Sequence, residues 1–112
     1  MDDKDGGQRP QAAPTVHIDN ERVRVTLWRF APGAATGWHR HEHDYVIVPL
    51  ADGRLELVGP GESRSFADLL QGVPYFREAG VEHDVINANA VEYAFVETEL
   101  KERPAGRKEP SS

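Results

Sequence analysis

The segment Gly37–Leu50, with the sequence GWHRHEHDYVIVPL, joins a cluster of histidines to an apolar run that is typical of a β-strand. His39, His41 and His43 occupy alternate positions in it. Alternate side chains of a strand point to the same face, so His39 and His41 would stand roughly 7 Å apart along the strand. Two imidazoles placed in this way can converge on one metal ion. An isolated H-x-H pair, however, more often consists of two exposed surface histidines.

A second segment, Gly80–Asn87 (GVEHDVIN), supplies a further histidine on another predicted strand, just after a glycine turn. Together the two segments resemble the two motifs of the cupin family. The resemblance covers roughly residues 23–99, which is nearly all of the chain that has the composition of a folded domain.

The match to the cupin motifs differs at one position in each. The first motif has a glycine, five residues, H-x-H, three or four residues, a glutamate and a later glycine. The residues that match it are Gly33, His39, His41 and Gly53, and Tyr45 occupies the glutamate position. The second motif has a glycine, five residues, a proline, one residue, a glycine, two residues, a histidine, three residues and an asparagine. The residues that match it are Gly72, Gly80, His83 and Asn87, and Glu78 replaces the proline.

The resemblance implies an all-β fold, the double-stranded β-helix or jelly roll of RmlC-like cupins. The sequence pattern agrees, because short alternating segments separated by turn residues indicate a small antiparallel barrel. The clearest strand is Arg22–Phe30, for which alternation predicts an apolar face of Val23, Val25 and Leu27. Asp52-Gly53 predicts a tight hairpin, because such turns favour glycine.

Composition divides the 112-residue chain into three parts. Residues 1–14 and 101–112 are rich in polar residues, glycine and proline, and we expect disordered tails there. Residues 15–100 form the expected cupin barrel, beginning with an edge strand at residues 15–18. His17 lies in that strand outside both motifs, so we expect it to be exposed.

Charge and residue usage exclude several classes of partner. The net charge is −6, and no basic footprint for nucleic acid is visible. The sequence has no cysteine, which excludes thiolate metal sites, and no apolar run of the length that crosses a membrane. The N-terminus lacks an apolar signal segment, so a cytoplasmic protein is expected. A small domain with a strand at Tyr45–Leu50 that is apolar on both faces predicts a homodimer.

The resemblance implies a metal site made of His39, His41 and His83. One divalent transition metal is expected, and imidazole donors alone do not select among zinc, iron, nickel, manganese and cobalt. Three protein ligands leave positions for water or substrate, which is the arrangement of catalytic metal sites. The alternative is a metal-free barrel in which the histidines hydrogen-bond to one another and to water.

Two further residues are candidate catalytic groups. Tyr45 is expected to face the same cavity, as a hydrogen-bond donor or substrate contact, or else as a core tyrosine. Glu78 could act as a general base, although it flanks a turn where exposed carboxylates are common. His43 is a possible fourth ligand that we expect at the rim. Arg40 and Arg77 could bind a substrate carboxylate.

The leading hypothesis for function is a small cupin with one divalent metal that acts on a small polar metabolite. The resemblance implies dioxygenase, isomerase, decarboxylase or lyase chemistry. The string WHRHEHDYVIVPLADG, residues 38–53, is similar to small cupins associated with β-alanine degradation. The alternatives are a non-catalytic small-molecule binding or sensor protein and a metal-free structural homodimer.

Overall fold

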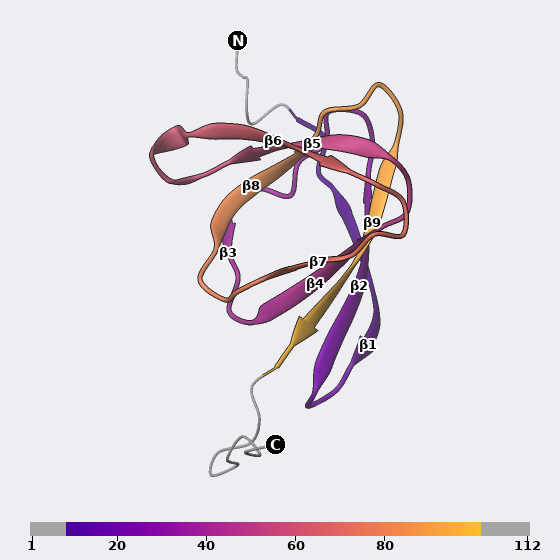
Figure 1. The fold of residues 1–112 in the computed structure, drawn as a ribbon, viewed down its shortest axis with the longest axis vertical. Coiled ribbons are helices and arrows are strands. Elements are labelled where there is room, and N and C mark those ends of the chain that lie inside the picture. The colour runs from indigo at the N-terminus through magenta and orange to yellow at the C-terminus, as the bar shows by residue number, and fades with distance from the viewer. Residues whose placement is uncertain (1–8, 102–112) are drawn as a thin grey trace.

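Two antiparallel sheets face each other in the computed structural model, which describes residues 9–101 (Figure 1). The first sheet has five strands in the order β1-β2-β9-β4-β7, and the second has four in the order β3-β8-β5-β6. The prediction of an all-β antiparallel barrel is confirmed.

The five-stranded sheet consists of β1 (Ala13–Asp19), β2 (Val23–Phe30), β9 (Tyr93–Leu100), β4 (Asp44–Pro49) and β7 (Tyr75–Arg77). The four-stranded sheet consists of β3 (His39–Arg40), β8 (Glu82–Asn87), β5 (Gly53–Val58) and β6 (Arg64–Leu69). A single 3-10 turn, η2 (Pro60–Glu62), joins β5 to β6 within the described residues. No helix in this part of the chain is long and apolar enough to cross a membrane.

The strand register decides which side chains of the five-stranded sheet face the interior. Cross-strand neighbours share a face of the sheet. Two rows of such neighbours point inward, and both line an internal cavity. Taken from β2 to β7, the first row consists of Arg24, Glu99, Tyr45 and Arg77. The second row, taken in the same order, consists of Thr26, Glu97, Ile47 and Tyr75.

The apolar face of Val23, Val25 and Leu27 is the outer face of β2. Thr26 and Phe30 are buried on the inner face, whereas Val25 and Leu27 are half-buried. Both faces of this strand carry apolar or aromatic residues, so alternation alone could not tell which one faces the cavity.

The predicted hairpin at Asp52-Gly53 was also wrong. This segment carries the chain from β4 in one sheet to β5 in the other, and these two strands do not pair. Glycine is required here by a close approach rather than by its backbone angles. A Cβ at Gly53 would lie 2.5 Å from Cε1 of Tyr93.

Residues 9–14 differ from the disordered tail that the sequence predicted. Ala12 is only 1% exposed, and its amide donates a hydrogen bond to the Ala35 carbonyl at 2.9 Å. The Ala35 amide in turn donates to the Pro10 carbonyl at 2.9 Å. The small side chains of Ala34 and Ala35 allow this close approach. Residues 1–8 and 102–112 of the predicted tails lie outside the described residues.

The C-terminal end of the described chain lies beside the turn between β1 and β2. Lys101, which was assigned to the C-terminal tail, donates from its Nζ to Asp19 Oδ1 and to the Asn20 carbonyl, both at 2.7 Å. His17 on the edge strand β1 is exposed, as predicted.

Asn87 fixes the end of β8 against the strand that precedes the histidine segment. Its side chain is 2% exposed, and Nδ2 donates to the carbonyls of Phe30 and Val91 at 3.1 Å and 2.9 Å. Its Oδ1 accepts the Asn89 amide at 2.8 Å, which shapes the turn after β8. The asparagine of the second motif therefore has a structural role.

Candidate metal centre

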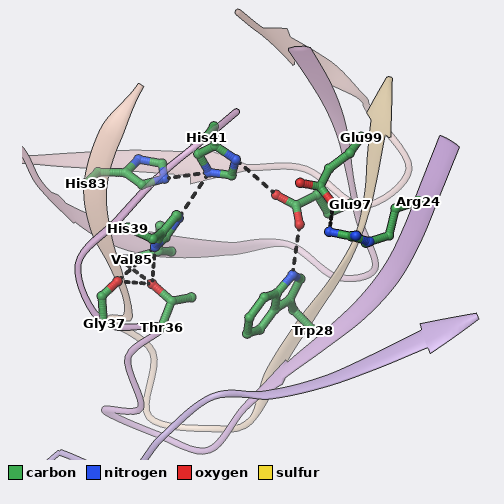
Figure 2. A network of polar contacts seen from close by, with 10 residues as sticks. All are labelled: Arg24, Trp28, Thr36, Gly37, His39, His41, His83, Val85, Glu97 and Glu99. Carbon is green, nitrogen blue, oxygen red and sulfur yellow. Dashed lines mark hydrogen bonds and ion pairs between the residues drawn. The ribbon is translucent and has the colours of Figure 1, made fainter. Parts of the chain in front are cut away.

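His39 and His83 face each other as direct cross-strand neighbours on β3 and β8. His41 comes from the irregular segment that follows β3, because the strand ends at Arg40 and the chain bends before β4 begins. The single strand expected through His39 and His41 is thus interrupted. The three histidines nevertheless point toward one another (Figure 2).

The Nε2 atoms of the three rings converge. His41 Nε2 lies 3.0 Å from His39 Nε2 and 3.1 Å from His83 Nε2. Two nitrogens that each lie about 2.0–2.1 Å from one ion are about 3 Å apart when the angle between them is near 90°. The spacing therefore fits three ligands of one transition metal ion.

The partner of His39 Nδ1 determines which ring nitrogen carries the proton. Nδ1 lies 2.8 Å from the Gly37 carbonyl oxygen, which can only accept, so the proton must be on Nδ1. The lone pair of His39 is then on Nε2, toward the cluster. Gly37 has φ 90°, and its amide donates to Asp84 Oδ1 at 3.0 Å, which holds the carbonyl in place.

Glu97 lies beside the corresponding nitrogen of His41, at a longer distance. Its Oε2 lies 3.6 Å from His41 Nδ1, on the side of the ring opposite the cluster (Figure 2). Its Oε1 accepts a hydrogen bond from Trp28 Nε1 at 3.0 Å. When Glu97 is ionised, its carboxylate favours the proton on Nδ1, which leaves the Nε2 lone pair facing the cluster.

Two lone pairs that face each other at 3.0 Å repel unless a cation lies between them. Burial lowers the pKa of His41 to about 4, with further lowering by His39 and Arg77. Burial also lowers the pKa of His83 to about 3, again with His39 as the next cause. Both rings are therefore neutral at pH 7, and neutral imidazoles are the form that binds metal. The donor set fits a metal ion.

Tyr45 occupies the position where the first motif has a glutamate. Its side chain is 2% exposed, faces the cavity as expected, and stacks on the His41 ring at a centroid distance of 3.8 Å. Burial raises the pKa of the Tyr45 hydroxyl to about 12, although the charge of Arg77 opposes this rise. The hydroxyl therefore stays protonated at neutral pH, and its catalytic role stays a prediction.

Two other candidates lie apart from the cluster. Glu78 is exposed in the turn between β7 and β8 and is not among the residues that line the cavity, so the structure does not bring this predicted base to the histidines. His43 is half-buried outside the three-histidine group. Its Nδ1 is buried without a hydrogen-bond partner among residues 9–101.

Glu97 is the residue of the site that the sequence analysis missed. It lies on β9 outside both motifs, where only alternation could have identified it. Tyr93, Phe95 and Glu97 form the buried face of that strand. A glutamate in phase with two buried aromatic residues indicates a carboxylate that points into the barrel.

The cavity beside the cluster has a volume of about 340 Å³. This is at the small end of the range for small-molecule sites in proteins. Apolar side chains of both sheets form much of its wall, among them Ile47, Leu55, Leu57, Val85 and Phe95. Charged side chains in the wall are Arg24, Arg40, Arg77, Glu97 and Glu99.

Comparison with known proteins identifies the family. No family model matches the sequence. A protein of Pseudomonas aeruginosa named beta-alanine degradation protein BauB is 64% identical over 93 residues, which are 83% of this chain and 97% of that protein. The crystal structure of a cupin domain from Bordetella pertussis is 56% identical, covers 85% of this chain and 98% of its own, and superposes with a TM-score of 0.82. This chain belongs to the cupin family.

More distant cupins share the fold. An RmlC-like cupin from Methanocaldococcus jannaschii with a double-stranded β-helix is 12% identical and superposes with a TM-score of 0.68 over 84% of each chain. The predicted cupin jelly roll is therefore confirmed. In this cupin, the two motifs supply the three converging histidines from β3, the segment after it, and β8.

Proposed function

We propose that this cupin binds one divalent transition metal ion through His39, His41 and His83 and acts on a small polar metabolite. The observation that carries the proposal is the convergence of the three Nε2 atoms. The Gly37 carbonyl holds the proton of His39 on Nδ1, so the lone pair of that ring points inward, and the Glu97 carboxyl lies 3.6 Å from His41 Nδ1.

The bound ion would supply Lewis-acid polarisation of a substrate or activation of O₂, which covers the dioxygenase, isomerase, decarboxylase and lyase reactions of cupins. The chain itself orients the ligands and shapes the cavity. The Gly37 carbonyl orients His39, the Glu97 carboxyl lies beside His41 Nδ1, and the apolar wall limits water around the reacting group.

We further propose that the metabolite belongs to β-alanine degradation. The relative from Pseudomonas aeruginosa carries that process in its name, and the 64% identity extends over 97% of its length. Such identity makes a shared substrate class the natural first hypothesis to test.

Elemental analysis of protein purified without an affinity tag or chelator tests the metal proposal. We expect about one transition metal ion per chain. The ion identified would then be used in an activity screen against small polar metabolites related to β-alanine. Protein that contains no metal and takes up none when zinc, iron, nickel, manganese or cobalt is added would contradict the proposal.

We also propose that the protein forms a homodimer through the outer face of its five-stranded sheet. One row of cross-strand neighbours on this face consists of Ile18, Val25, Thr98, Val46 and Phe76, and is apolar except for the threonine. Ile18 and Phe76 are 46% and 52% exposed. A second copy of the chain would cover this apolar face.

A further inference from the structure

Arg77 lies at the end of a charged row on the interior face of the five-stranded sheet. From β2 to β7 the row consists of Arg24, Glu99, Tyr45 and Arg77, and all four residues line the cavity. Tyr45 therefore stands between Arg77 and the glutamate of this row.

The other two arginines of the cavity wall have carboxylate partners. Arg24 Nη1 lies 3.5 Å from Glu99 Oε1, and Arg40 Nε lies 3.7 Å from Glu82 Oε2. Arg77, by contrast, forms no ion pair and no side-chain hydrogen bond with any residue from 9 to 101. Its side chain is half-buried, which makes an unpaired charge costly unless water or a ligand solvates it.

The glutamate nearest the cluster does not neutralise Arg77. Glu97 is held by the Trp28 indole and lies beside His41.

The cross-strand neighbour of Arg77 on β4 is Tyr45, which offers no carboxylate. Arg77 is therefore a cation of the cavity wall that has no ion-pair partner among residues 9–101.

We propose that the cavity binds a small monocarboxylate whose carboxylate pairs with Arg77 and whose other end lies at the histidine cluster. A guanidinium binds a carboxylate through two parallel hydrogen bonds, which fixes orientation as well as position. The apolar wall formed by Leu55, Leu57 and Val85 suits the short hydrocarbon part between the two ends. This inference rests on the proposed function, since it names the substrate class of the same site.

The test compares propionate with propionamide, which has the same size but no charge. Binding is followed by NMR titration of the zinc-loaded protein and of the metal-free protein. Propionate is expected to bind more tightly than propionamide in both. Arg77→Gln should weaken propionate binding by about 10- to 100-fold, the loss expected for a charge-assisted hydrogen-bonded pair, and leave propionamide binding unchanged.

Two variants serve as controls. Arg29→Gln removes an exposed arginine of β2 that lies on the outer face of the same sheet, and should bind propionate like the wild type. Arg77→Lys keeps the charge but loses the paired donors, so it should fall between the wild type and Arg77→Gln. Equal affinity for propionate and propionamide in the wild type, or unchanged propionate binding by Arg77→Gln, would overturn the proposal.

Zinc uptake, measured on the same samples, separates this inference from the proposed metal site. Protein that takes up no zinc but binds propionate in an Arg77-dependent manner would refute the metal site and keep the carboxylate site. Protein that takes up zinc and binds propionate only in the zinc-loaded form, independently of Arg77, would place the carboxylate on the metal and refute the role of Arg77.

Discussion

The ring of Tyr45 lies flat against the ring of His41, with their centroids 3.8 Å apart and their planes inclined by 17°. The first cupin motif has a glutamate at this position, and here an aromatic ring supports one of the histidines instead. Because burial raises the pKa of the Tyr45 hydroxyl to about 12, its oxygen remains a protonated phenol at neutral pH. The observed contact with His41 is made by the Tyr45 ring.

Replacing Tyr45 tests this assignment. Tyr45→Phe keeps the ring and should leave zinc affinity nearly unchanged. Tyr45→Leu removes the stack and should lower zinc affinity by about 2- to 12-fold, since such aromatic pairs contribute about 0.5–1.5 kcal/mol. Competition with a chromophoric chelator measures both. A loss in Tyr45→Phe as large as that of a histidine variant would show that the hydroxyl oxygen is a ligand.

Replacing Glu97 tests its role in orienting His41. Glu97→Gln can still accept the Trp28 hydrogen bond but no longer places a carboxylate beside His41 Nδ1. We expect zinc affinity to fall by about 10- to 100-fold, the usual effect of removing the partner of a metal-binding histidine. Glu99→Gln is the matched control, because that glutamate lines the same cavity but pairs with Arg24. Equal affinities of the two variants would contradict the role of Glu97.

Acid should destabilise the metal-free protein. Burial lowers the pKa of His41 to about 4 and of His83 to about 3 from an ordinary value of 6.5. Between pH 6.5 and 4.5 the unfolded chain binds protons at both histidines while the native state does not, so the free energy of unfolding falls as the pH falls. Glu97 acts in the opposite sense, because burial raises its pKa from 4.5 to about 7 and the native state gains that proton.

As the pH falls to 4.5, the unfolded state gains about two protons, at His41 and His83, while the native state gains about one, at Glu97. The free energy of unfolding therefore decreases toward pH 4.5. Urea unfolding in the presence of a chelator measures this dependence. A double variant with His41→Gln and His83→Gln retains only the Glu97 contribution at the site and should lose the acid destabilisation relative to the wild type. The same pH dependence in both proteins would contradict the assignment.

The outer face of the five-stranded sheet should hold the homodimer together. Phe76→Glu places a charge in the exposed apolar row and should give a monomer in sedimentation velocity. Val91→Glu is the control, because Val91 is 67% exposed in the segment between β8 and β9, outside this sheet. A Phe76→Glu variant that remains dimeric would require a different interface, and a monomeric wild type would remove the dimer altogether.

The fold and the three histidines could be predicted from the sequence because their signals are local. Turn residues between short alternating segments indicate an antiparallel barrel, and the spacing around His39, His41 and His83 matches a known pair of motifs. The face that β2 buries could not be predicted, because Thr26, Trp28 and Phe30 on one side compete with apolar residues on the other.

Features that depend on distant parts of the chain were missed for a related reason. Asp52-Gly53 has a turn sequence, but nothing local to it shows whether the strands before and after the turn pair with each other. Ala12 is buried only because Ala34 and Ala35 offer it a surface. Glu97 becomes part of the site through the register of β9 with its neighbours, which brings it beside His41.

Calorimetric titration of zinc into metal-free protein tests the three-histidine site most directly. The wild type should bind about one equivalent per chain, and His39→Ala, His41→Ala and His83→Ala should each lose most of this binding while keeping the β-sheet signal in circular dichroism. His17→Ala, which changes an exposed histidine of β1, should bind like the wild type. One full equivalent of zinc bound by a double variant with His39→Ala and His83→Ala would contradict the account.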